Sequence, residues 1–255
     1  MSSCNRVTTI PTPIYNMPQV PFLSLPLSKD SQNRLMAIET IALPGTPLHI
    51  LSQLSSHLLS IETEAYPDLS PLYIDARFLE EKTKEPFVKF KELPPLASII
   101  SKLRSLQGIR YFWGGTWEEG IAQMWTYYPH LSQADTYDRE DSLCQGVDCS
   151  GLLYRVTNGY TPRNTAQLAH FGQEIPFTSL LPHKVQSLLQ PLDIIVWKGH
   201  VIIVLSQDEL IESRLGTGVV ISGFKKRFEE ISIQLTAENR PFYLRRWLPS
   251  ISLST

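Results

Sequence analysis

Short runs of apolar and β-branched residues, separated by turn residues, follow one another over residues 33–80. Four of these runs, RLMAIETIAL, PLHILSQL, HLLSIETEAY and LYIDARFLE, predict β-strands. Four or five strands in fewer than sixty residues are too few for a sandwich but suit a small, partly open barrel. Residues 1–30, in contrast, carry five prolines and little periodicity, which predicts an irregular leader.

The pattern changes after residues 82–95, which are charged and interrupted by prolines, as a linker is. The stretch LASIISKLRSLQG has apolar residues at helical spacing and ends at Gly108, so it predicts a helix with a glycine cap. Further on, DIIVWKG, HVIIVLSQDELIES and VVISGF predict strands of a buried or half-buried sheet. A helical half therefore precedes a β half.

These patterns predict an α+β chain in three parts: an irregular leader over 1–30, a small β domain over 31–90 and a larger domain over 91–255. The length supports this division, because 255 residues, 42% of them hydrophobic and 19% charged, can bury a sizeable core. The formal net charge is −2, which creates no long-range field favouring nucleic acid, so we expect no nucleic-acid partner.

Targeting signals and cysteine usage narrow the expected environment. No apolar run approaches the roughly 18 residues of a membrane span, so we expect no integral membrane segment. The first twenty residues lack the basic and then apolar pattern of a secretory signal, which favours a cytoplasmic location, with export by an unconventional route left open. Three cysteines do not form a disulfide framework, and reduced thiols fit a cytoplasm.

The segment DCSGLLYRV places Cys149 at the start of a predicted helix, with Asp148 and Ser150 beside it as candidate caps. The N–H groups and the dipole of a helix N-terminus favour a thiolate, which is the nucleophilic form of cysteine. The alternative is a buried, inert cysteine.

His200 is the best-placed histidine to activate such a thiol. It follows a glycine and opens the apolar run VIIVL, so it is expected at the end of a core strand. A Cys–His pair needs a third polar group to orient the imidazole, and Glu212 meets that need. The run HVIIVL, a turn at SQDE and then LIES predict a hairpin that returns Glu212 to His200. The alternative for Glu212 is a solvated charge on an edge strand.

Five segments of the chain then carry a family signature. YFWGG, GVDCSGLLY, TPRNTAQLAHFGQEI, LQPLDIIVWKGHVIIVL and the polar residue after the hairpin resemble, in this order, the NlpC-type cell-wall peptidases of the NlpC/p-sixty superfamily, over about residues 95–247. The resemblance implies a papain-like fold in permuted order, and the preceding strands resemble a bacterial SH3-like barrel. It implies cleavage between γ-D-glutamate and the diamino acid of peptidoglycan stem peptides, with no metal or cofactor.

By motif position, the resemblance makes Cys149 the nucleophile, His200 the general base and Glu212 the residue that orients the imidazole. Many members have histidine at the third position, so Glu212 is a departure, although a carboxylate also accepts from the imidazole N–H. Tyr111 and Trp113 match the aromatic motif of the family. The resemblance implies that Tyr111 directs its hydroxyl toward the thiolate and that Trp113 lines the cleft. The alternative is that both residues are core aromatics.

Asp148 and Ser150 are implied to contact the polar ends of the stem peptide, with simple helix capping as the alternative. Arg163 is either a carboxylate partner or a loop brace, and we favour the brace. Residues 116–145 separate the aromatic motif from Cys149. We interpret them as an insertion near the active-site rim that narrows the cleft or forms a partner surface.

Three competing functions remain open at this point. An amidase or acyltransferase would use the same Cys–His pair on another acyl group. A non-catalytic wall-binding protein would rely on its barrel, in which Glu62, Glu64 or Tyr73 are candidates for binding an amine. A zinc site with Cys144 and Cys149 lacks paired-ligand spacing. The sequence does not determine the oligomeric state or the diamino acid.

Overall fold

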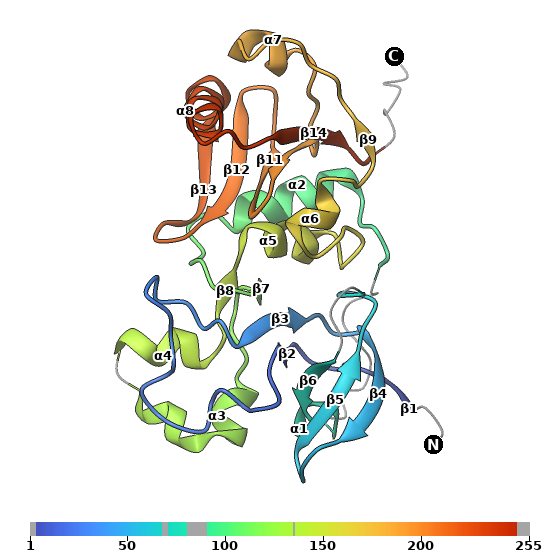
Figure 1. Ribbon diagram of the computed structural model, residues 1–255, viewed down its shortest axis with the longest axis vertical. Coiled ribbons are helices and arrows are strands. Elements are labelled where there is room, and N and C mark those ends of the chain that lie inside the picture. Colours follow the sequence, from blue (N-terminus) through green and yellow to red (C-terminus); the bar gives the residue numbers. More distant parts are fainter. Residues whose placement is uncertain (1–3, 68–70, 81–90, 135, 249–255) are drawn as a thin grey trace.

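The computed structural model describes residues 4–67, 71–80, 91–134 and 136–248. It contains two antiparallel six-stranded sheets, in the lower and upper halves of Figure 1, and a short two-stranded ribbon between them. The chain is therefore a mixed α/β protein, in which each half builds its own sheet. Most of the predicted linker, residues 82–90, lies outside the described residues.

The first sheet has the strand order β1-β4-β5-β6-β2-β3. Its strands are β1 (Cys4–Val7), β2 (Thr12–Tyr15), β3 (Ile38–Ala42), β4 (Pro47–Gln53), β5 (Leu58–Glu62) and β6 (Leu72–Asp75). The four predicted strands are confirmed as β3 to β6. The prediction of an irregular leader was wrong for β1 and β2, because these strands are only four residues long and no periodicity is visible in so short a segment.

The predicted insertion packs on the first sheet. It contains α3 (Gln123–Tyr127), the 3-10 helix η1 (Pro129–Gln133) and α4 (Thr136–Ser142). Met124, Tyr128 and Leu131 are buried against Tyr15 and Phe22 in one apolar cluster. Next to this cluster, α1 (Arg77–Glu80) follows the last strand of the sheet. The insertion thus completes the core of the lower half in Figure 1.

The second sheet has the strand order β13-β12-β11-β10-β14-β9. Its strands are β9 (Gln173–Glu174), β10 (Ile194–Trp197), β11 (His200–Val204), β12 (Glu209–Arg214), β13 (Gly218–Gly223) and β14 (Phe242–Arg246). The predicted strands are confirmed as β10 to β13. The remaining short helices of this half are α6 (Thr165–Leu168) and α7 (Pro182–Gln186).

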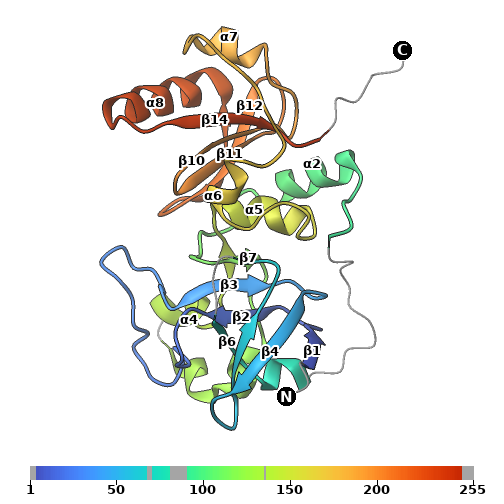
Figure 2. The ribbon, with the colours of Figure 1, turned by 45° about the vertical axis from the view of Figure 1, so that its right-hand side comes forward.

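Longer helices cover both faces of this sheet, as Figure 2 shows. On one face lie α2 (Leu96–Ser105), which is the predicted helix, and α5 (Cys149–Val156), and both bury leucines against the strands. The other face is covered by α8 (Phe224–Ala237), which the sequence analysis did not predict. Its buried residues Phe224, Phe228, Ile231 and Leu235 recur at helical spacing.

Residues 111–117 run between the two sheets and connect them. Ile41 of the first sheet donates its backbone N–H to the oxygen of Gly114 at 3.0 Å, and β7 (Thr116–Trp117) pairs with β8 (Gly146–Val147). The oxygen of Gly115 accepts from the N–H of Asp148 at 3.0 Å. A Cβ on Gly151 would lie 1.9 Å from that same oxygen, so only glycine lets α5 approach this segment.

Within the described part of the chain, no helix has both the length and the apolar character needed to cross a membrane.

Candidate active site

Cys149 is the first residue of α5, where the sequence placed it. Asp148 caps this helix, and its Oδ1 accepts from the N–H of Gly151 at 2.6 Å. The Cys149 side chain is largely buried, with 7% of the residue exposed, and its Sγ lies 3.9 Å from the carbonyl oxygen of Gly199. The thiol therefore faces the turn that leads directly into His200.

His200 and Glu212 meet through the predicted hairpin. Strands β11 and β12 are antiparallel, with Ile203 opposite Ile211, and His200 Nε2 lies 2.8 Å from Glu212 Oε2. Because Nε2 is engaged by the carboxylate, Nδ1 is the ring nitrogen left for the side chain of Cys149. The structure thus brings the three predicted residues together. Glu212 is only 1% exposed, which excludes a solvated edge charge.

The surroundings of His200 favour its charged form. Burial alone would lower its pKa, but the hydrogen bonds and charges of Cys149 and Glu212 raise the pKa of His200 to about 9. For Glu212, burial opposes ionisation, yet the hydrogen bonds from His200 and Arg227 hold the pKa of that carboxyl below its usual range. These contacts therefore stabilise the imidazolium that forms once His200 has accepted a proton.

This pKa predicts how the stability of the fold changes with pH. Since the pKa of His200 is higher in the folded chain than in the unfolded chain (about 6.5), its contribution is complete below about pH 6.5 and is lost as the pH rises to about 9. We expect the free energy of unfolding to fall by roughly 3 kcal/mol over this interval, measured by urea unfolding. His200→Gln, the control, should lack this part of the decline; an equal decline in both proteins would contradict the assignment.

Two side chains beside the triad were missed by the sequence analysis. Arg227 of α8 forms a bidentate ion pair with Glu212, with Nε 2.6 Å from Oε1 and Nη2 3.0 Å from Oε2. Trp197, at the end of β10, holds its ring 5.0 Å from that of His200, centroid to centroid. The helical spacing of Phe224, Phe228, Ile231 and Leu235 is the signal that could have revealed α8. No local sequence pattern predicts the contact between Arg227 and Glu212.

Tyr111 and Trp113 lie on the segment that joins the two sheets. Burial raises the pKa of the Tyr111 phenol, and the charges of Asp148 and Cys149 raise it further. Trp113 lies under the guanidinium of Arg34, whose Cζ is 4.8 Å from the ring centroid.

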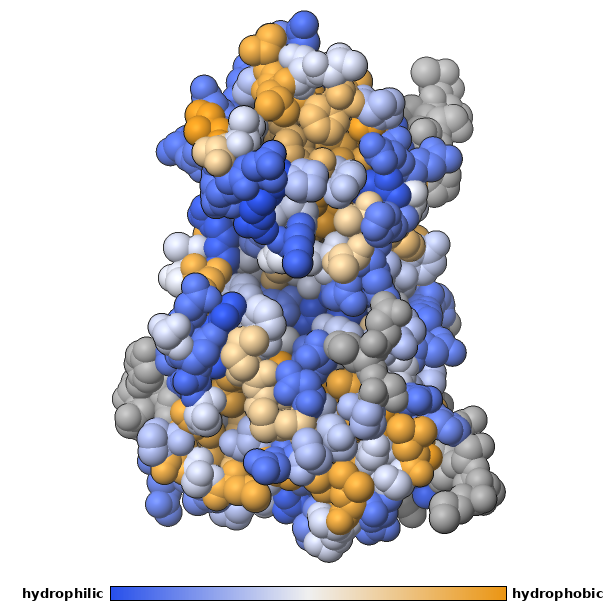
Figure 3. All heavy atoms as spheres, viewed as in Figure 1, coloured by the Kyte–Doolittle hydropathy of each residue, from blue (hydrophilic) through white to orange (hydrophobic). Residues whose placement is uncertain are grey.

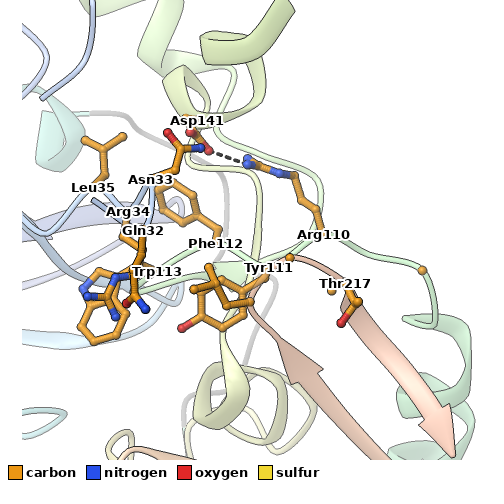
Figure 4. Close-up of a pocket in the computed structure, with 14 residues that line it drawn as sticks. Gln32, Asn33, Arg34, Leu35, Arg110, Tyr111, Phe112, Trp113, Asp141 and Thr217 are labelled. Atoms are coloured by element: carbon orange, nitrogen blue, oxygen red, sulfur yellow. Dashed lines mark hydrogen bonds and ion pairs between the residues drawn. The ribbon is translucent and has the colours of Figure 1, made fainter. Parts of the chain in front are cut away.

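Both aromatic rings also line a pocket of about 390 Å³ between residues 32–35 and 215–218 (Figure 4). Its lining contains neither Cys149 nor His200. The surface between the two halves is hollowed and lined by hydrophilic residues (Figure 3).

Asp148 and Ser150 are engaged by Arg163. This buried guanidinium donates from Nη2 to Asp148 Oδ2 at 2.6 Å and from Nη1 to Ser150 Oγ at 2.8 Å, while its Nε donates to Thr40 Oγ1 at 2.8 Å. Arg163 is therefore the brace that the sequence analysis favoured, and it ties the start of α5 to β3. Asp148 serves as helix cap and ion-pair partner, and contact of Asp148 or Ser150 with substrate stays a prediction.

The remaining sequence candidates lie on the first half of the chain. Glu62 and Glu64 line a pocket of about 490 Å³ beside β1 and β4, and Glu64 also pairs with Lys91 at 2.9 Å. Tyr73 packs on the apolar cluster beneath the insertion. Cys144 is fully buried in that cluster. Among the described residues, no group of three or more His, Cys, Asp or Glu side chains is arranged to hold a metal ion.

Comparison with known proteins gives distant structural matches only. No family model and no curated protein matches the sequence. An NlpC/P60 family protein from Bacillus cereus is similar over 96% of this chain, with 16% identity and a TM-score of 0.40, and this chain spans 63% of its length. NlpC2 and NlpC1 from Trichomonas vaginalis match 97% and 96% of this chain and are covered over 74% and 69% of their own lengths. Their identities are 15% and 14%, and their TM-scores 0.38 and 0.36.

Proposed function

We propose that this chain is a cysteine peptidase that cleaves the bond between γ-D-glutamate and the diamino acid of peptidoglycan stem peptides. The observation that carries the proposal is the placement of the Cys149 sulfur 3.9 Å from the carbonyl oxygen of Gly199, the residue before His200, with His200 Nε2 2.8 Å from Glu212. A thiol at a helix N-terminus, an imidazole and an orienting carboxylate are the parts that a nucleophilic cysteine needs.

In the proposed mechanism, His200 takes the thiol proton and the Cys149 sulfur attacks the amide carbonyl. The N–H groups at the start of α5 stabilise the oxyanion, which is typically worth about 3 kcal/mol for each donor. His200 then returns the proton to the departing amine as the C–N bond breaks and a thioester forms. Water, deprotonated by His200, hydrolyses the thioester and releases the γ-glutamyl acid and the free thiol.

The substrate class rests on the sequence motifs. The five segments over about residues 95–247 occur in the order seen in NlpC-type peptidases, and α5 precedes the sheet that carries His200. We include in the proposal that the first sheet is an SH3-like barrel bordering the cleft. The acidic residues Glu62 and Glu64 are then candidates for a free N-terminal amine of the peptide.

Digestion of defined peptides tests this proposal. The purified protein should convert L-Ala-γ-D-Glu-diamino acid tripeptides into L-Ala-γ-D-Glu and the free diamino acid, detected by mass spectrometry. Parallel digests of intact sacculi and of free tri- and tetrapeptides show which form is the substrate. Transfer of the acyl group to an added amine would indicate an acyltransferase. Binding of wall fragments without any cleavage would overturn the peptidase assignment.

A further inference from the structure

A buried ion pair lies behind the proposed triad. Both oxygens of Glu212 are in contact with Arg227, and Oε2 is shared with His200 Nε2. The Arg227 side chain is 13% exposed and the Glu212 side chain 1%, so little water separates these charges. The third nitrogen of the guanidinium, Nη1, lies 3.2 Å from Glu230 one turn further along α8.

The pair matters because Glu212, which accepts from the imidazole, is itself charged. An isolated buried carboxylate would bind the imidazolium so strongly that His200 would return its proton to a leaving amine less readily. Arg227 adds a positive charge on the far side of the same carboxylate. Glu212 and Arg227 together then have no net charge, as a neutral acceptor has.

The position of Arg227 is fixed by the core. Phe224, Phe228 and Ile231 of α8 are buried against the second sheet, and Arg227 precedes Phe228 directly. The helix therefore holds the guanidinium in place, and its printed hydrogen bonds go to Glu212 and Glu230. The other group that acts on the charge of His200 is Cys149, and Arg214 follows two residues beyond Glu212 on β12.

We propose that Arg227 is a positioning residue that acts through Glu212: the two side chains form one acceptor of zero net charge, which keeps the His200 ring directed at Cys149 and able to release its proton. The proposal rests on the proposed role of His200 as the base for Cys149. It assigns to α8, on the opposite face of the sheet from α5, a part in setting the pH range of the site.

Three variants separate charge from geometry. Arg227→Met removes the charge and the bidentate contact. Arg227→Lys keeps the positive charge but replaces the bidentate contact with Glu212 by that of a single ammonium group. The double variant Glu212→Gln/Arg227→Met restores an acceptor without net charge. Arg104→Met is the matched control, since Arg104 also pairs with a carboxylate of β12, Glu209, but at an exposed site.

Two readouts are recorded for each variant. The first is the midpoint of the His200 titration, followed by NMR with labelled histidine and assigned with His200→Gln. The second is the pH profile of kcat for tripeptide cleavage. For Arg227→Met we expect the titration midpoint and the alkaline limb to move up by about one pH unit, and kcat at neutral pH to fall about tenfold with KM unchanged.

The other variants make the expectation specific. Arg227→Lys should keep the wild-type titration midpoint while losing kcat, because the charge stays and the bidentate contact is lost. The double variant should be more active than Glu212→Gln or Arg227→Met alone, whereas independent effects would make it the least active. An unchanged His200 midpoint in Arg227→Met, or a double variant less active than both single variants, would overturn the proposal.

The NMR titration needs no substrate and so distinguishes two kinds of failure. Shifted midpoints without peptide cleavage by any variant would leave the Arg227 role standing and remove the proposed peptidase function. Cleavage by the wild type with an unshifted midpoint in Arg227→Met would remove only the role of Arg227. If Arg227→Met does not fold, the same comparison is made with Arg227→Lys and the double variant.

Discussion

Replacement of Cys149 by alanine is expected to lower kcat/KM for stem-peptide cleavage by about 10⁴-fold or more. The change removes the only atom that forms the covalent thioester in the proposed mechanism, and the other residues of a triad contribute little without their nucleophile. The fold should survive, because alanine fills most of the space of a small thiol and Asp148 still caps α5. The measurement is tripeptide turnover by mass spectrometry, together with thermal unfolding of both proteins.

Cys144→Ala is the control for this loss. Cys144 is fully buried in the cluster beneath the insertion, and burial raises the pKa of its thiol, so it is an inert cysteine. This variant should retain turnover and should still be alkylated by iodoacetamide at Cys149. Undiminished turnover by Cys149→Ala would exclude the proposed nucleophile.

Replacement of Arg163 by methionine is expected to cost about 3–5 kcal/mol of unfolding free energy. The change leaves Asp148 buried without its counter-charge and removes the bonds to Ser150 and Thr40 that tie α5 to β3. Breaking one side of a buried ion pair is among the most destabilising single changes in a protein. Urea unfolding measures the effect, and reactivity of Cys149 toward iodoacetamide reports whether the start of α5 has moved.

Two comparisons make the Arg163 result specific. Arg104→Met breaks an exposed pair with Glu209 and should cost less than about 1 kcal/mol. The double variant Asp148→Asn/Arg163→Met should recover part of the lost stability, because it no longer buries an unpaired carboxylate. A cost for Arg163→Met as small as that of the exposed control would show that the ion pair is dispensable.

The position of Cys149 at the start of a helix and the contact between His200 and Glu212 could be predicted because each depends on a local pattern. A capping residue before an apolar helix placed Cys149, and two apolar runs around a polar turn placed Glu212 beside His200. These signals span at most about a dozen residues. The physical interactions that they report, a cap hydrogen bond and a hairpin register, are equally local.

Such local patterns could not predict the contact of Arg227 with Glu212 or the place where the insertion packs. Arg227 reaches Glu212 only because α8 crosses the face of the sheet opposite α5, and this depends on tertiary packing. Likewise, Tyr128 donates its hydroxyl to Asp75, a residue of the first sheet 53 positions earlier. A contact between residues so far apart in sequence produces no periodic pattern. The insertion was therefore expected at the active-site rim and not in the core beside the first sheet.

The contact between Gly115 and Gly151 has a consequence for how this chain can evolve. Helix α5 rests on a backbone segment that is also hydrogen-bonded to Ile41 of the first sheet. A recombination event that exchanged the amino-terminal half for an unrelated module would therefore remove part of the support under Cys149. The two halves are expected to be inherited together, and substitutions near Thr40 and Ile41 should be constrained as strictly as those beside the thiol.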